Sequence, residues 1–193
     1  MLVKTNYGGG VNKFWRGEAK ILPSPYKVTN APAVGAVIER GVLAYATPDL
    51  ECTLLRTVEA YADISTTTLK VKKGSLVAVG TRLSDGTNAA AVAAVDTTTS
   101  EDYDTLTLSE TITGVKAGNV LFEAAAEAAT ALVSPNVVVG SDKQVTVYDG
   151  TNVVVDLAYD AVVLRGIAAP VPASVLDGGL CLKDNHSIKF INQ

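Results

Sequence analysis

The sequence predicts a mainly β protein: a small β-sandwich or β-barrel with tight glycine turns, one short alanine-rich helix and an extended N-terminal arm. The first observation is a phrase that occurs four times, an aliphatic residue, two further residues, a glycine, one residue and another aliphatic. Glycine tolerates positive φ, so we expect these glycines at corners between strands: Gly41, Gly74, Gly118 and Gly178. Their unequal spacing indicates recurrent turn chemistry and not a repeat protein.

Composition supports the same fold class. The 193 residues suffice for one domain, or for one domain with an appendage. Hydrophobic residues make up 48% of the chain and aromatic residues only 6%, and this dominance of Ala and Val favours thin packing between sheets. The net charge of −4 gives no basic footprint, so we expect no nucleic-acid partner.

Export and membrane signals are not visible in the sequence. No stretch approaches the roughly 18 apolar residues of a membrane span, and the first residues contain no apolar run of signal-peptide length. We therefore expect synthesis in a cytoplasm, no export by the general secretory route and no membrane partner.

Residues 1–30 differ in composition from the rest of the chain, because they are rich in glycine, proline and basic residues. One interpretation is an extended arm that docks on a partner, since aromatic residues are favoured at interface hot spots. The docking residues would be Lys13, Phe14, Trp15 and Arg16. The other interpretations are a strand that folds back on its own domain, or a loose terminus. Residues 31–193 would form the β domain, as one unit or as two sub-parts with a break near residue 135.

Short strands and turn signals alternate from residue 31 onward. We expect strands on both sides of Gly41 and of Gly74, and one over 53–58, where no clean alternation assigns the two faces. Ala89–Val95 is compatible with a strand or a short helix, and the polar loop that follows favours a strand. Residues 103–108 alternate well, as a half-buried strand does.

The second half of the sequence contains the helix and the clearest hairpin signal. Residues 123–132 are rich in alanine, the best helix former, and Pro135 would end the helix. Alternating valines on both sides of Asp149-Gly150 predict a hairpin between 144–148 and 152–157. Residues 187–191 predict a terminal strand.

Candidate catalytic and metal-binding groups are few. His186 is the single histidine and lies five residues after Cys181, with no nucleophile motif around it, so we expect a surface residue. Cys52 and Cys181 do not form a disulfide framework, and we favour free thiols over a single bridge. The acidic loop could hold Ca²⁺ but lacks the pattern of a calcium loop, which favours a solvated turn: Asp96, Glu101, Asp102 and Asp104. The sequence thus predicts no enzyme, cofactor or metal site.

The stretches 69–80, 90–95, 103–108 and 116–124 resemble auxiliary capsid proteins of tailed bacteriophages, the head-fibre and small head-decoration types. The later segments 131–138 and 153–165 resemble them as well. The resemblance is one of pattern and composition and covers 65–165 best. It implies a mainly β fold, a homotrimer on capsid symmetry axes, and an N-terminal segment that contacts the major capsid protein.

The resemblance also implies a location on the outer capsid surface of a virion, where a host-surface glycan is a possible further partner. The chain departs from these types in being longer than the smallest decoration proteins and in lacking the shaft of a long fibre. The alternative is a stand-alone β-sandwich module for carbohydrate binding or adhesion. A tail or baseplate component is a third possibility.

Overall fold

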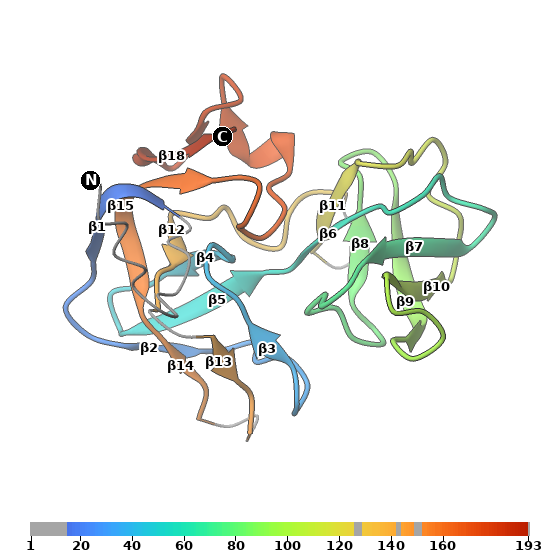
Figure 1. The fold of residues 1–193 in the computed structure, drawn as a ribbon, viewed down its shortest axis with the longest axis horizontal. Coiled ribbons are helices and arrows are strands. Elements are labelled where there is room, and N and C mark those ends of the chain that lie inside the picture. Colours follow the sequence, from blue (N-terminus) through green and yellow to red (C-terminus); the bar gives the residue numbers. More distant parts are fainter. Residues whose placement is uncertain (1–14, 126–128, 142–143, 149–151, 193) are drawn as a thin grey trace, which may run out of the picture.

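The structure is a computed structural model that describes residues 15–125, 129–141, 144–148 and 152–192. It consists of two β lobes that lie side by side (Figure 1). The larger lobe is built from both ends of the described chain and the smaller lobe from its middle. Within the described residues the helical content is one 3-10 turn, η1 (Ala173–Val175). The mainly β fold expected from the sequence is confirmed.

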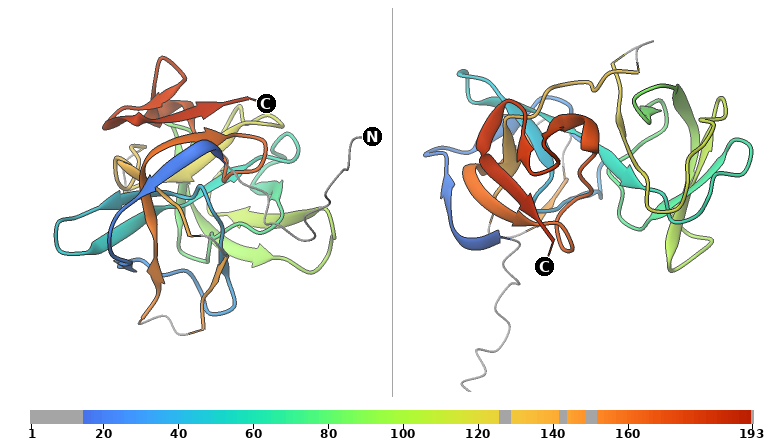
Figure 2. Two further views of the ribbon diagram at one scale, coloured as in Figure 1. Left: turned by 60° about the vertical axis from the view of Figure 1, so that its left-hand side comes forward. Right: turned by 90° about the horizontal axis from the view of Figure 1, so that it is seen from above.

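The smaller lobe is a six-stranded sheet that curls into a barrel (Figure 2). Its strand order is β6-β11-β8-β9-β10-β7. The antiparallel bridge between Ala60 and Val71, with a 2.8 Å hydrogen bond from the Tyr61 N–H to the Lys70 carbonyl, joins the two ends of this order. Its strands are β6 (Thr57–Glu59), β7 (Thr68–Lys72), β8 (Arg82–Ser84), β9 (Ala89–Asp96), β10 (Tyr103–Leu108) and β11 (Val120–Glu123). Inward-facing aliphatic side chains, with Leu69, Leu83, Leu106 and Leu121 fully buried, fill its interior.

The larger lobe is a ten-stranded sheet with the order β14-β2-β5-β4-β12-β15-β18-β17-β16, in which β1 also pairs with β15. Its strands are β1 (Trp15–Ile21), β2 (Tyr26–Val28), β4 (Leu43–Ala46), β5 (Glu51–Leu55), β12 (Val137–Val139), β14 (Val154–Val155), β15 (Leu157–Leu164), β16 (Leu176–Asp177), β17 (Cys181–Leu182) and β18 (Asn185–Ile191). A separate two-stranded sheet joins β3 (Val37–Ile38) to β13 (Val145–Thr146).

The central strands of the larger sheet are buried on both faces. Leu43 and Leu55 point into one hydrophobic cluster, while Ala44 and Leu54 point into the other. A strand that is covered on both faces needs no polar face and therefore shows no alternation. This explains why the sequence around residues 53–55 did not reveal which side chains face the core.

The N-terminal region is a strand folded back on its own lobe from residue 15 onward. Trp15 and Arg16 pair with Val163 and Val162 of β15, and β2 lies between β14 and β5. The boundary expected at residue 30 is therefore not where the sheet begins. Lys13 and Phe14 lie outside the described residues.

The expected helix over residues 123–132 is wrong for the residues that are described. Glu123 belongs to β11, and its N–H donates to the Arg56 carbonyl at 2.7 Å. Ala124 and Ala131 form an antiparallel bridge, and the Leu132 N–H donates back to the Glu123 carbonyl at 2.9 Å. Pairing with neighbouring strands overrides the helix propensity of alanine, which is a weak preference.

The predicted hairpin is also wrong in its pairing, although both of its strands exist. β13 pairs with β3 and β14 pairs with β2, so the two segments belong to different sheets. The predicted turn at Asp149-Gly150 lies outside the described residues. The strands expected over 89–95, 103–108 and 187–191 are confirmed, as β9, β10 and β18.

All four glycines of the recurring phrase have positive φ, with values of 79°, 81°, 83° and 56° in chain order. Gly178 shows the reason most directly, because it starts the tight turn between β16 and β17, where Asp177 pairs with Cys181. A residue with a Cβ atom is strained in this conformation.

Candidate functional site

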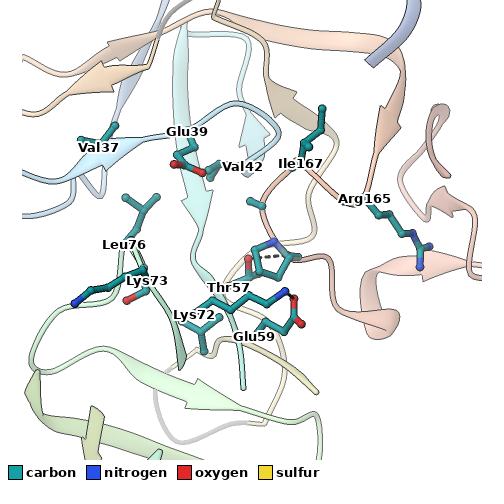
Figure 3. A pocket seen from close by; sticks show the side chains of 17 residues that line it. Val37, Glu39, Val42, Thr57, Glu59, Lys72, Lys73, Leu76, Arg165 and Ile167 are labelled. Atoms are coloured by element: carbon teal, nitrogen blue, oxygen red, sulfur yellow. Dashed lines mark hydrogen bonds and ion pairs between the residues drawn. The ribbon is translucent and has the colours of Figure 1, made fainter. Parts of the chain in front are cut away.

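A cavity of about 330 Å³ lies where the two lobes meet (Figure 3). The larger lobe contributes the segment from Val37 to Val42 and the loop Arg165–Pro170. The smaller lobe contributes β6 and the turn after β7, from Lys72 to Leu76. Ligand sites favour such junctions between structural units, and their volumes begin at about 300 Å³. This cavity is therefore the candidate binding site.

The turn after β7 is held by a buried carboxylate. Asp104, whose side chain is only 3% exposed, contacts Lys73 Nζ through Oδ1 at 2.9 Å and accepts a hydrogen bond from the Gly74 N–H on Oδ2 at 3.1 Å. Lys73 also donates to the Thr97 carbonyl. The Lys73 ammonium group is therefore directed away from the cavity, as Figure 3 shows, while the backbone of the turn forms the cavity wall.

The base of the cavity joins the lobes through a hydrogen bond. The Thr57 hydroxyl donates to the Pro170 carbonyl at 2.7 Å, across 113 residues of sequence. Arg165 also lines the cavity, but its guanidinium donates to the Gly179 carbonyl and points outward in Figure 3. The loop from 165 to 170 is thus fixed at both of its ends.

A mostly buried ion pair lies at the same junction. Arg56 Nη1 and Glu123 Oε1 are 3.2 Å apart, and each side chain is 12% exposed. Arg56 also donates to the Asn30 carbonyl at 2.8 Å and to the Thr81 hydroxyl at 3.3 Å, so its guanidinium holds groups from both lobes. Burial raises the pKa of Glu123, and the positive charge of Arg56 opposes this rise.

Side-chain packing reinforces the junction. Phe122 is 2% exposed and follows the barrel residue Leu121, so its ring points out of the barrel. It packs into a hydrophobic cluster of the larger lobe that includes Val138 and Phe190. The ion pair, the Thr57–Pro170 hydrogen bond and this ring together fix the two walls of the cavity relative to each other.

The charges at the cavity come from three side chains. Lys72 Nζ and Glu59 Oε2 are 2.8 Å apart, so these two charges offset each other. Glu39 lies on the opposite wall (Figure 3) and accepts a hydrogen bond from the Gln144 amide at 3.3 Å. Val42 and Leu76 add apolar surface. This arrangement can bind a group that is part apolar and part positively charged.

The groups that the sequence singled out for chemistry lie apart. His186 is exposed and pairs with Asp177 at 3.3 Å. Cys52 is buried and Cys181 is half-buried, and both are free thiols; burial raises the pKa of Cys52 to about 12. Across the described ranges, no three His, Cys, Asp or Glu side chains are grouped so that they could hold a metal ion.

The acidic loop is a set of local turn contacts. Asp96 accepts hydrogen bonds from the backbone and side chains of Thr98 and Thr99, which lower its pKa, while Asp104 is turned inward to Lys73. Among the residues that the structure describes, no helix is long and apolar enough to cross a bilayer.

Of the residues predicted to dock on a partner, the described ones form part of the sheet. Trp15 is half-buried against the larger lobe's core, and Arg16 is exposed on β1. Of the four turn glycines, Gly74 lines the cavity.

Sequence reasoning missed Glu39, Glu59 and Lys72, yet a signal for two of them was present. In two of the four glycine phrases both intervening residues are charged, Glu39-Arg40 before Gly41 and Lys72-Lys73 before Gly74. These two phrases face each other across the cavity. Comparison with known proteins found no family model, no curated protein and no solved structure that matches the chain.

Proposed function

We propose that the chain is a virion structural protein that decorates or stabilises a bacteriophage head by binding the major capsid protein, as a head fibre or decoration protein. It acts as a homotrimer on the outer capsid surface. A trimer can bind the shell tightly through contacts that are each weak. Once one copy is bound, the linked copies are held close to their own sites, which raises the overall affinity. Binding only the expanded shell would stabilise that form of the shell.

One observation carries this proposal. The segments 69–80, 90–95, 103–108 and 116–124, on which the sequence resemblance rests, contribute β7, β9, β10 and β11 to the same barrel. The later segments, 131–138 and 153–165, contribute β12 and β15, which pair with each other in the larger sheet. The resemblance therefore follows structural units rather than scattered strands, which supports a shared architecture.

The two lobes could have separate roles, one binding the capsid and the other facing outward. The larger lobe carries β1, on which Arg16 is exposed and Lys20 pairs with Asp160 at 2.8 Å, and we assign this lobe to the capsid side. The barrel lies beside it and would face away from the shell. Positive charges on the docking side would speed association with an acidic shell.

The mass in solution tests the assembly. Light scattering on a sizing column is expected to give three times the protomer mass, which is 20.0 kDa for the full chain, and likewise three times its own smaller protomer mass for a chain that begins at residue 14. The truncation stops there because β1 starts at Trp15. A monomer or dimer that persists at high concentration would contradict the trimer.

Sedimentation with purified heads that lack their own auxiliary protein tests the partner. The chain is expected to sediment with expanded heads at a fixed ratio to the major capsid protein, and not with unexpanded heads. Arg16→Glu should weaken this binding most at low salt, whereas Lys116→Glu, an exposed control in the barrel, should not. Expanded heads that sediment without the chain would reject the proposal.

A second candidate function, carbohydrate binding, is favoured by one surface feature. Tyr61 is 47% exposed, and its ring centroid lies 5.2 Å from that of Tyr103, over which Lys70 Nζ sits at 4.5 Å. Exposed aromatic faces with polar neighbours suit ligands that are partly apolar. A glycan array tests this function: binding that Tyr61→Ala abolishes and Tyr148→Ala retains would favour it, since Tyr148 is 84% exposed.

A further inference from the structure

We propose that the cavity between the lobes is a binding site for a basic side chain of a polypeptide. A lysine is the best fit, with its ammonium group at Glu39 and its aliphatic stem along Val42 and Leu76. This inference goes beyond the proposed function and does not depend on it, because the ligand is defined by its chemistry and not by the capsid.

The balance of charge inside the cavity argues for a cation. Lys72 is paired with Glu59 at 2.8 Å. Lys73 is bound to Asp104 and Arg165 to the Gly179 carbonyl, so both of these positive heads are directed elsewhere. Glu39 remains as the charge without a cationic partner among the described residues. A positively charged group therefore complements the cavity, and an anion does not.

The walls argue for a group with an aliphatic stem. Val42 is buried and Leu76 half-buried; Figure 3 places Val42 beside Glu39 and Leu76 on the turn after β7, which faces them. A lysine side chain buries its methylene groups along apolar surface and keeps its charge at a polar group. Ser75 and the loop 166–170 line the remaining surface, and the Ser75 hydroxyl can accept a further hydrogen bond.

The volume argues for a side chain of a larger partner instead of an inorganic ion. About 330 Å³ is far more than one ion fills, and the described residues contain no grouping of carboxylates that could hold a metal ion there. The junction contacts at Thr57, Arg56 and Phe122 hold the walls in place before binding. A preformed site avoids the cost of ordering its walls.

The test uses the full chain and three blocked amino acids, N-acetyl-lysine-N-methylamide and its arginine and norleucine counterparts. The lysine compound should shift the backbone NMR signals of Val42, Thr57 and Leu76 in a saturable way, with a dissociation constant of about 1 mM, typical of a small weak ligand. The arginine compound should also bind, because its guanidinium carries the same positive charge on an aliphatic stem. The norleucine compound has a similar aliphatic chain without the charge and should not saturate.

Two variants locate the binding. Glu39→Gln should weaken the affinity for the lysine compound about fivefold, the effect of one partly exposed ion pair. Glu51→Gln, which removes another exposed carboxylate, one that does not line the cavity, should leave the affinity unchanged. Raising the salt concentration should weaken binding to the wild type more than binding to Glu39→Gln.

Several results would overturn the inference: no saturable shift with the lysine compound, equal binding of the norleucine compound, or an affinity that Glu39→Gln leaves unchanged. Because Glu39 is exposed, its substitution is not expected to affect folding, and thermal unfolding of each variant checks this. Capsid binding measured in parallel keeps the two proposals separate, since either one can fail while the other holds.

Discussion

The ion pair between Arg56 and Glu123 should be strongly coupled, and a double-mutant cycle can measure this. Both side chains are 88% removed from solvent, since each is 12% exposed. Glu123→Leu leaves a guanidinium that cannot lose its charge, with the Asn30 carbonyl and the Thr81 hydroxyl as its remaining partners. We expect this variant to lose about 3 kcal/mol of unfolding free energy, at the lower end for a broken buried pair.

Arg56→Leu should cost less, about 2 kcal/mol, because a carboxyl group can escape an unpaired charge by taking up a proton. The pKa of Glu123 is already raised by burial. The double variant removes both charges and should lose about 2 kcal/mol of unfolding free energy. This loss is about 3 kcal/mol smaller than the sum of the two single losses. In a chain of this length, a loss of 3 kcal/mol lowers the melting temperature by about 6–12 °C.

Equilibrium unfolding in urea provides the assay. Circular dichroism follows both lobes, and the fluorescence of Trp15, the single tryptophan, follows the larger one. Coincident transitions would show that the lobes unfold together, and a lower m-value in a variant would show that they have become independent. Additive single effects, or single losses below about 0.5 kcal/mol, a size typical of surface substitutions, would refute the reasoning.

Three further predictions concern the pH dependence of unfolding, one glycine in the larger sheet and the two cysteines. Because burial raises the pKa of Glu123 above its ordinary value of 4.5, the folded state binds more protons than the unfolded state between that value and the raised pKa. The unfolding free energy of the wild type, measured relative to Glu123→Gln, should therefore fall as the pH rises above 4.5. A difference that rises with pH would contradict the shift. Gly140→Ala should cost about 1–3 kcal/mol in urea unfolding, because its Cβ would lie 3.1 Å from the backbone nitrogen and from the Cβ of Ala158, whereas Gly166→Ala, with open space around it, should change little. A thiol reagent should react quickly with Cys181 and with Cys52 only after unfolding, since Cys52 is fully buried and its pKa is raised to about 12; two fast equivalents would contradict this.

The corners and several strands could be predicted from the sequence because they depend on local chemistry. A glycine between two aliphatic residues specifies a turn wherever it occurs, and all four such glycines have positive φ. Residues 103–108 alternate because one face of β10 is buried and the other is not. Such information lies within a few neighbouring residues.

The pairing of strands could not be predicted in the same way. β13 and β14 carry the pattern of a hairpin, yet β3 and β2 are their partners, and nothing local distinguishes the two outcomes. Glu123 lies in an alanine-rich sequence that suits a helix, and contact with Arg56, 67 residues earlier, places it in a strand. The cavity is likewise assembled from segments that are distant in sequence, so only its charged glycine phrases were visible.

The position of the barrel within the chain has a consequence for the order of folding. In the sequence, the barrel separates β5 from β12, the next central strand of the larger sheet, which pairs with β4. Beside this pair the Ala46 N–H donates to Oδ1 of Asn136, 90 residues later. A chain emerging from the ribosome can complete the barrel before β12 has been made, since domains fold as units during synthesis. The entry and exit of the barrel are hydrogen-bonded, from the Glu123 N–H to the Arg56 carbonyl.

Once the barrel is closed, it therefore acts as a short connection between β5 and β12. Closing a long flexible loop costs entropy that grows with its length, and a folded insert removes most of that cost. Formation of the larger lobe should then be limited by the barrel, so that a substitution deep inside the barrel would slow the folding of strands it never touches.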